Sequence, residues 1–398
     1  MFGEKYLQKN NNIPLIHQLP ENDLGIIVVI PCLREPDILK TLESVGRCDL
    51  PKVKVEVIVL INHSETASAE TKAYNLKTKT EIEAWISNNP KQGIRFFTAG
   101  SIELKKKWAG AGLARKWGMD EAVRRFNLLG KANGLIVSLD ADTLVDKNYL
   151  TSIENHFIRN PKHIGATVAF KHQTENLLPK QLEGILLYEK YLKYYKEALA
   201  YSGYPHAMFT VGSAFTVKAG AYVKRGGMNR RQAGEDFYFL QNLVQMGKVG
   251  EITSTTIYPS ARLSDRVPFG TGPILQKWMD GQENLEETYN FEAFKDLKAF
   301  FDLKDTLFKI EKTPFDLIVS KLPQPIGSFI KEDNFWDDLE DLNRNCSTLK
   351  SFQTRFYQKF NAFKILKFLN FSHESFYEKV NIEEQVAELA KAKSGTIN

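Results

Sequence analysis

The first half of the chain alternates continuous apolar runs with segments of helical periodicity. Strands are predicted where β-branched residues dominate, and helices where apolar residues recur every three or four positions. The predicted strands are residues 25–30, 53–61, 94–97, 134–139, 164–170 and 252–258. The predicted helices are residues 37–45, 70–86, 110–126, 146–157 and 179–199. Apolar strands separated by helices indicate an α/β domain with a mostly parallel sheet.

Beyond about residue 280 the pattern changes, because Phe, Leu, Lys and Asp then recur at helical spacing without further strand-like runs. The sequence therefore predicts an N-terminal extension (1–22), an α/β domain (23–280) and a C-terminal helical region (281–398). No internal repeat or low-complexity segment interrupts this division.

Composition limits the class of protein without choosing a function. With 398 residues and 43% hydrophobic content, the chain can bury a substantial core. Its net charge of +5 is the small difference between 53 basic and 48 acidic residues, so nucleic acid is not implied as a partner. The three cysteines lack metal-ligand spacing, which fits a reducing cytoplasm. We expect no signal peptide and no transmembrane segment, and we leave peripheral contact with the inner membrane face open.

Two aspartates, Asp140 and Asp142, close the apolar run at 134–139. If the strand continues through them, both carboxylates point the same way, because successive side chains alternate faces. They could then face one cation, and hard oxygen ligands favour Mg²⁺ or Mn²⁺. A nucleotide diphosphate would complete the site, since Mg²⁺ is usually held by one or two carboxylates plus phosphates. The alternative is that Asp142 and Thr143 only form a turn and cap before a helix.

Five short motifs follow one another along residues 30–236. They are Ile-Pro-Cys-Leu-Arg-Glu at 30–35, Gly-Leu-Ala-Arg at 112–115 with Gly118, Asp-Ala-Asp at 140–142, Val-Gly-Ser at 211–213 and Gly-Glu-Asp at 234–236. In this order they resemble glycosyltransferase family 2, over about residues 24–260. The resemblance implies a GT-A fold, which is a Rossmann-like, mixed and mostly parallel sheet flanked by helices. It also implies an inverting enzyme that moves a sugar from a nucleotide diphosphate, commonly UDP, to an acceptor hydroxyl.

The same resemblance implies residue roles. Nucleotide-binding positions are Pro31, Arg34 and Glu35 in the loop after the first strand, with Arg115 and Asp140 near the nucleotide. Asp142 matches the metal-binding aspartate, which Asp140 assists, and Gly212 and Ser213 are assigned to the acceptor side.

The pair Glu235–Asp236 contains the candidate catalytic base. A diphosphate leaving group bridged by a divalent cation needs no protonation, so only one carboxylate is required, to accept the acceptor's proton. Either residue could supply it, and the family favours Asp236. If a helix begins here, its dipole stabilises an ionised carboxylate. Plain helix capping is the alternative.

The chain departs from the family after the second strand, where Asn62-His63-Ser64 replaces the two aspartates that many members carry. Asn62 can still form hydrogen bonds to a base or ribose, although not as a carboxylate. His63 has no metal-spaced histidine beside it and is predicted to be a loop residue.

Three further segments have open interpretations. Arg262 and Arg266 lie in a stretch rich in Gly and Pro at 260–273, and they either grip the diphosphate from a mobile lid or belong to a fixed connector. His206 lines an acceptor pocket or is simply buried. The stretch 352–371 places Phe356, Phe360 and Phe363 on one side. It is either an amphipathic helix that lies on a membrane surface, for a lipid-linked acceptor, or a segment that packs against the catalytic domain.

The motif of processive synthases is absent, which favours a single addition. The sequence thus predicts an inverting transferase of a UDP-sugar, dependent on Mg²⁺ or Mn²⁺, with a glycan, lipid-linked or small-molecule acceptor. Two alternatives stay open. One is a retaining synthase or nucleotidyltransferase on a related sheet, and the other is a catalytically silent module that binds nucleotide sugars.

Overall fold

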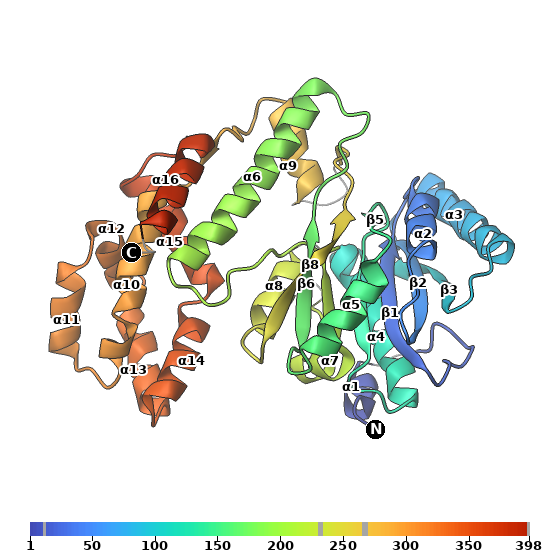
Figure 1. Ribbon diagram of the computed structural model, residues 1–398, viewed down its shortest axis with the longest axis horizontal. Coiled ribbons are helices and arrows are strands. Elements are labelled where there is room, and N and C mark those ends of the chain that lie inside the picture. Colours follow the sequence, from blue (N-terminus) through green and yellow to red (C-terminus); the bar gives the residue numbers. More distant parts are fainter. Residues whose placement is uncertain (11–12, 230–233, 265–269, 396–398) are drawn as a thin grey trace. The chain divides into compact units, whose positions relative to one another are not determined.

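The protein is described by a computed structural model that covers residues 1–10, 13–229, 234–264 and 270–395. It forms two compact units (Figure 1). The first comprises Met1–Leu178 and Thr210–Lys277, and the second comprises Pro179–Phe209 and Trp278–Asn398. The prediction places the boundary before the C-terminal helices at residue 280. In the structure, residues 179–209 also group with these helices. The N-terminal residues predicted as an extension group with the first unit.

The first unit contains an eight-stranded sheet of order β3-β2-β1-β4-β7-β6-β8-β5. The strands are β1 (Leu24–Cys32), β2 (Lys54–Ser64), β3 (Ile94–Leu104), β4 (Leu135–Ser138), β5 (Leu144–Val145), β6 (Gly165–Phe170), β7 (Phe215–Lys218) and β8 (Val249–Tyr258). Four neighbouring pairs are parallel, whereas β7 runs antiparallel to β4 and β6, and β5 runs antiparallel to β8. The predicted α/β class with a mixed, mostly parallel sheet is confirmed. The short strands β5 and β7 were not predicted.

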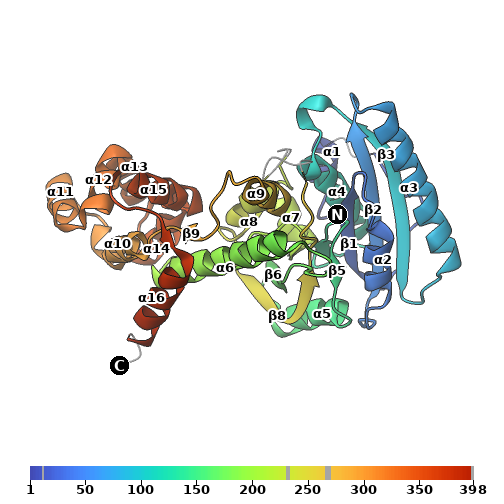
Figure 2. The ribbon, with the colours of Figure 1, turned by 90° about the horizontal axis from the view of Figure 1, so that it is seen from above.

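Helices cover both faces of this sheet. They are α1 (Glu4–Lys9), α2 (Ile38–Gly46), α3 (Ala69–Asn88), α4 (Ala111–Leu128), α5 (Tyr149–Arg159), α7 (Ala219–Arg225) and α8 (Glu235–Leu243), and α9 (Thr271–Met279) follows β8. Buried residues of α2, α3 and α5 pack with alternate residues of β1, β2 and β4 in one core. Figure 2 shows α3 beside the edge strand β3.

Helix α4 lies on the opposite face and approaches β1 closely at Gly118. A Cβ atom at this position would lie 2.3 Å from Cγ1 of Val29, so only glycine fits here. This close approach fixes the helix that carries Arg115 against the centre of the sheet.

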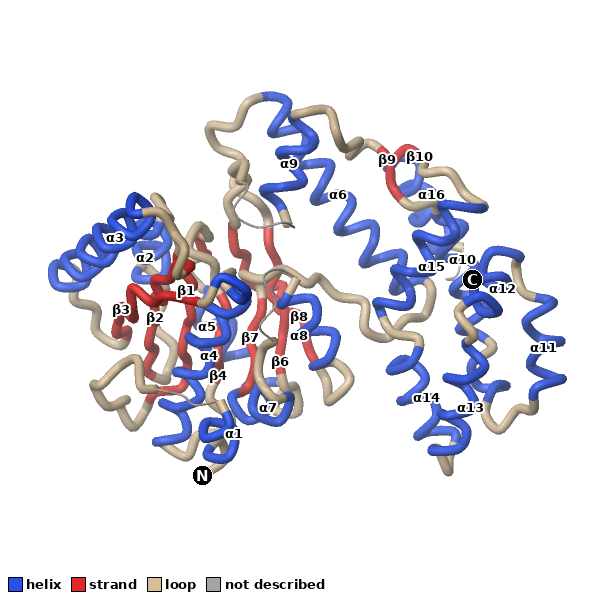
Figure 3. Tube along the Cα trace, turned by 180° about the vertical axis from the view of Figure 1, so that it is seen from behind, coloured by secondary structure: helices blue, strands red, loops and turns tan. Residues whose placement is uncertain are grey.

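The second unit is helical, as predicted for the C-terminal region (Figure 3). Its elements are α6 (Pro179–Tyr201), β9 (Glu287–Thr288), α10 (Phe291–Asp302), α11 (Lys312–Lys321), α12 (Gln324–Glu332), α13 (Phe335–Asn345), α14 (Leu349–Lys359), α15 (Ala362–Ser375), β10 (Val380–Asn381) and α16 (Ile382–Ser394). No helix in the described part of the chain is both long and apolar enough to cross a membrane.

Phenylalanines form much of the core of this unit. Phe356 and Phe360 are fully buried, and their rings pack against Phe300 and Phe335 at centroid distances between 5.3 and 5.9 Å. The stretch 352–371, considered above as one amphipathic helix, belongs to the two helices α14 and α15. Packing within the second unit accounts for Phe356 and Phe360, and Phe363 is half-buried.

Candidate active site

Arg115, in the second turn of α4, is the hub of a buried charge cluster. Its Nη2 donates to Oδ1 of Asp140 at 2.9 Å, and its Nε donates to Oε1 of Glu235 at 3.2 Å. Burial lowers the pKa of Arg115, but the Asp140 and Glu235 carboxylates outweigh it and raise the pKa overall. The guanidinium is thus a fixed positive charge that joins residues from three distant parts of the sequence.

The third arm of Arg115 holds the backbone at Gly212. Its Nη1 donates to Oγ of Ser138 at 2.6 Å and to the carbonyl oxygen of Gly212 at 3.1 Å, and Ser138 Oγ donates to the same carbonyl at 2.6 Å. A Cβ atom at Gly212 would lie 2.9 Å from Arg115 Nη2 and 3.1 Å from Asp236 Oδ2. The chain therefore needs glycine at 212 for Arg115 and Asp236 to approach each other.

Ser213, next in the chain, has a buried hydroxyl group. Its Oγ has no hydrogen-bond partner among the described residues. A buried hydroxyl without a hydrogen-bond partner is costly. The assignment of Ser213 to the acceptor side stays a prediction.

Glu235 and Asp236 begin α8, as predicted, but their environments differ. Glu235 is buried and pairs with Arg115, whereas Asp236 is half-buried and accepts a hydrogen bond at Oδ1 from the Phe237 N–H at 2.7 Å. Burial, and next the Glu235 carboxylate, raise the pKa of Asp236 to about 7, although Arg115 lowers it. A carboxylate with such a pKa can accept a proton near neutral pH. Of the two acids, Asp236 has the properties of a base.

The Asp140–Asp142 segment is a turn rather than the end of a strand. Strand β4 ends at Ser138, and the N–H of Thr143 donates to the carbonyl oxygen of Asp140 at 3.1 Å. The argument that both carboxylates share a strand face therefore does not apply. Other contacts hold the turn. Oγ1 of Thr41 donates to the carbonyl of Ala141 at 2.9 Å.

Gln173 fastens the same turn to β8, since its Nε2 donates to the carbonyl oxygens of Asp142 at 2.9 Å and of Tyr258 at 2.7 Å. The Asp142 carboxylate faces another guanidinium, with Oδ2 lying 3.3 Å from Nη2 of Arg262. Each aspartate of the turn is thus paired with a different arginine.

Arg262, in the segment after β8, contacts three carboxylates. It forms a two-pronged hydrogen bond with Glu35, in which Nη1 lies 2.8 Å from Oε1, and its Nη1 lies 3.7 Å from Oδ2 of Asp37. The hydrogen bonds that Arg262 donates to Glu35 raise the pKa of Arg262, as do the charges of Glu35, Asp142 and Asp37. The second arginine expected here, Arg266, lies outside the described residues.

The loop after β1 is held by a buried residue that the sequence did not single out. Asn75 of α3 is fully buried, accepts from the N–H of Arg34 at 3.0 Å and donates to the carbonyl oxygen of Asn62 at 2.8 Å. Arg34 has a φ of 47°, a conformation that non-glycine residues adopt rarely. The sequence offered one signal for Asn75, which is its helical spacing from Thr78 and Ile82. These three residues form the buried stripe of α3.

Pro31 and Asn62, also proposed for the nucleotide side, lie in strands of the sheet. Pro31 lies within β1, and Nδ2 of Asn62 donates to the carbonyl of Cys32 at 3.2 Å. His63 is buried within β2 rather than lying in a loop, and its Nδ1 lies 3.0 Å from Oγ of Ser101. The expected contacts of Asn62 with a base stay a prediction.

His206 belongs to the second unit. Its ring packs edge-on against Tyr204 at a centroid distance of 5.5 Å, and burial lowers its pKa. These contacts fit the simpler interpretation of a packed histidine.

A divalent cation would find two carboxylates in this site, Asp140 and Asp142. Among the described residues no group of three or more His, Cys, Asp and Glu is placed to hold a metal ion. Two carboxylates with phosphate oxygens are nevertheless a sufficient donor set for Mg²⁺. Both carboxylates now accept from arginines, so the donor set fits if Arg262 releases Asp142.

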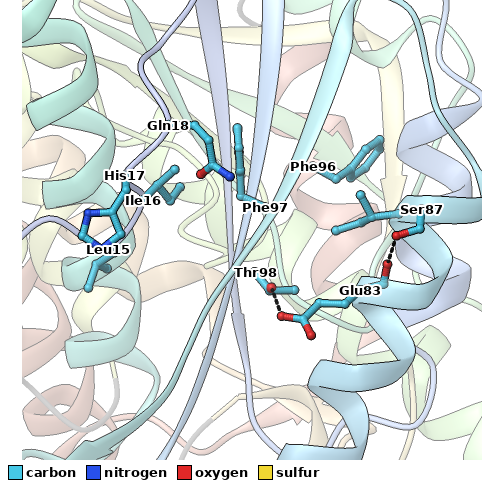
Figure 4. A pocket seen from close by; sticks show the side chains of 10 residues that line it. Leu15, Ile16, His17, Gln18, Glu83, Ser87, Phe96, Phe97 and Thr98 are labelled. Carbon is cyan, nitrogen blue, oxygen red and sulfur yellow. Dashed lines mark hydrogen bonds between the residues drawn. The ribbon is translucent and has the colours of Figure 1, made fainter.

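A cavity of about 340 Å³ lies elsewhere in the first unit (Figure 4). Residues 15–18, α3 and the edge strand β3 line it, and Oγ1 of Thr98 donates to the Glu83 carboxylate at 3.2 Å there. None of the predicted site residues lines this cavity, so it is no candidate for the nucleotide.

No family model matches the sequence, and no curated protein matches it. Among solved structures, the chain is similar to S. aureus TarS 1-349 in complex with UDP-GlcNAc, with a TM-score of 0.43, 10% identity and coverage of 84% of this chain and 92% of that chain. It is also similar to mannosyltransferase PcManGT from Pyrobaculum calidifontis in complex with GDP-Man and Mn²⁺, with a TM-score of 0.38, 13% identity and coverage of 100% and 86%. With TM-scores below 0.5, these likenesses assign no activity to the chain.

Proposed function

We propose that the protein is an inverting glycosyltransferase that moves one sugar from a nucleotide diphosphate, most simply UDP, to an acceptor hydroxyl. The proposal rests on the surroundings of the Asp236 carboxylate. This carboxylate is half-exposed beside the Arg115 cluster, and its pKa is raised to about 7. This is what a general base for a neutral hydroxyl requires.

The order of the five sequence motifs supports the same function, and so do the contacts between residues of different motifs. Arg115 lies close to Asp140 at the carboxyl end of β4, where open α/β sheets bind their ligands. Gly212 lies directly beside Asp236 and Arg115, and Ser213 follows it in the chain. Arg115, Asp236 and Gly212, assigned to the nucleotide, the base and the acceptor, are thus neighbours in the first unit, which supports the proposal.

In the proposed reaction the acceptor oxygen attacks the anomeric carbon while Asp236 accepts its proton. The bond between that carbon and the diphosphate oxygen breaks, and the diphosphate leaves with the electron pair. Attack from the face opposite the leaving group inverts the anomeric configuration. Ser213 would orient the acceptor hydroxyl, and Arg115 would hold Asp140 and the Gly212 backbone in place.

Asp142, assisted by Asp140, would hold the divalent cation. When bound, that cation would neutralise the charge that develops on the leaving diphosphate. Arginines of this chain would supply the other positive charges near the diphosphate. Their planar pairs of N–H donors suit phosphate oxygens.

A donor panel tests the proposal. The protein is incubated with UDP- and GDP-sugars and Mn²⁺ or Mg²⁺, and released nucleoside diphosphate is measured, because transferases slowly hydrolyse their own donors. Proton NMR of the transferred or hydrolysed sugar then reports the anomeric configuration. Retention would assign the alternative retaining class, and nucleotide binding without turnover of any donor would assign the silent binding module.

A further inference from the structure

Arg262 connects three carboxylates from two separate loops. Glu35 and Asp37 come from the loop between β1 and α2, and Asp142 comes from the turn after β4. Asp37 also pairs with Lys40 at 2.7 Å, so its contact with Arg262 is a secondary one.

The contacts of Arg262 are unequal. Glu35 is 3% exposed and engages two nitrogens of the guanidinium, and its Oε1 also accepts from the N–H of Asp37 at 3.1 Å. Asp142 is 26% exposed and meets Arg262 through one nitrogen at 3.3 Å. Two parallel charge-assisted hydrogen bonds are stronger and more directional than one long contact. Glu35 is therefore the anchor, and Asp142 is the contact that can be exchanged.

A divalent cation held by Asp142 would compete with Arg262 for this carboxylate. A guanidinium so close to Asp142 would repel a cation bound there, and binding the cation would need the guanidinium to move. A nucleoside diphosphate supplies the phosphate oxygens that the displaced guanidinium can bind.

We propose that Arg262 is an exchange residue and that Glu35 is its positioning residue. Without nucleotide, Arg262 neutralises Asp142 and keeps the affinity for a divalent cation low. When cation and nucleoside diphosphate enter together, Asp142 passes to the cation and Arg262, still anchored on Glu35, passes to the diphosphate. Cation and nucleotide therefore bind cooperatively. This inference rests on the proposed function for the chemistry of the ligand.

The test is binding of Mn²⁺ alone, measured from the electron paramagnetic resonance signal of free Mn²⁺ in titrations without nucleotide. Arg262→Gln should bind Mn²⁺ about tenfold more tightly than wild type, since coupling between sites is commonly of this size. At saturating Mn²⁺ the same variant should bind UDP about tenfold more weakly in calorimetry. The matched control is Arg47→Gln, which removes an exposed pair with Glu43 and should change neither affinity.

Two additional variants keep the test decisive. Arg262→Lys preserves the charge but cannot bind Glu35 with two prongs, so it should weaken UDP binding without tightening Mn²⁺ binding to the level of Arg262→Gln. Glu35→Gln should also weaken UDP binding, while Mn²⁺ binding should become no tighter because Arg262 still faces Asp142. Thermal midpoints within a few degrees of wild type show that each variant folds.

Unchanged or weaker Mn²⁺ binding by Arg262→Gln overturns the exchange, whatever the donor panel shows. If that variant binds Mn²⁺ more tightly but no sugar donor is turned over, the exchange stands and the proposed function fails. If the donors are turned over but Mn²⁺ binding is the same in every variant, the function stands and the exchange fails.

Discussion

Asp236→Asn removes the proposed base with little change in shape. An amide cannot accept the acceptor's proton, so kcat should fall by about a hundredfold or more while KM for the donor stays close to wild type. In the wild type, kcat/KM should rise with pH and level off above about pH 7, because the ionised form of Asp236 is active and its pKa is about 7. The variant should lose this inflection.

The same substitution should stabilise the protein at neutral pH. The pKa of Asp236 is raised from an ordinary 3.8 to about 7, so the folded state binds this proton more tightly than the unfolded state does. Stability contributed by the protonated form is then lost as pH rises from about 4 to about 7. The full difference corresponds to about 4 kcal/mol, and because Asp236 is half-buried we expect about half of it.

Differential scanning fluorimetry from pH 5 to 8.5 measures this effect. The midpoint of Asp236→Asn minus that of wild type should grow between pH 5 and 7 and then stay constant. For a unit of this size, 1 kcal/mol corresponds to roughly 2–4 °C. If the difference in midpoint did not depend on pH, Asp236 would have an ordinary pKa. The argument for its role as a base would then be refuted.

Glu235→Gln is the matched control. It removes the neighbouring charge that raises the pKa of Asp236 but leaves the base in place. Its activity profile should keep an inflection, displaced to lower pH. If instead Glu235→Gln abolishes the inflection and Asp236→Asn retains it, the assignments of the two acids must be exchanged.

Three other substitutions test the surroundings of the base. Asp142→Ala should abolish Mn²⁺-dependent UDP binding in calorimetry, because a carboxylate that would hold the cation is lost; unchanged affinity would refute the metal assignment. Gly212→Ala forces its new methyl group against Arg115 and Asp236 and should lower kcat/KM about tenfold with a stability cost of about 1–3 kcal/mol; full activity would contradict the packing. Asn75→Ala leaves the N–H of Arg34 without its buried acceptor and should cost about 1–3 kcal/mol in urea unfolding and weaken UDP binding, whereas a neutral effect would remove its positioning role.

The parallel half of the fold was predictable because its strands are continuous apolar runs. Strands β1, β2 and β4 bury residues on both faces, so their sequences differ plainly from those of the helices. The antiparallel strands β5 and β7 have two and four residues, too few to show a period. The place of α6 was not predictable either, since its packing partners α10 and α16 begin 90 and 181 residues after α6 ends.

The candidate residues of the site could be found from short motifs, but their pairing could not. Nothing in the sequence indicates that Arg115 joins Asp140 to Glu235, or that Arg262 selects Glu35, because these contacts depend on how distant loops meet. The turn at Asp142 shows the limit of strand periodicity, which predicted a shared face that the chain does not form.

The pairing shows how four acids of the candidate site come to differ in their surroundings. Arg115 pairs with Asp140 and Glu235, and Arg262 pairs with Asp142. Asp236 forms no ion pair within the described chain, and burial and the charge of Glu235 therefore raise its pKa. Separate environments that move the proton affinities of adjacent acids apart are how a site divides its acid and base chemistry. Replacing Arg115 should for this reason raise the pKa of Asp236 further, because the charge of Arg115 lowers that pKa in the intact protein; an unchanged inflection in the pH profile of kcat/KM would contradict this.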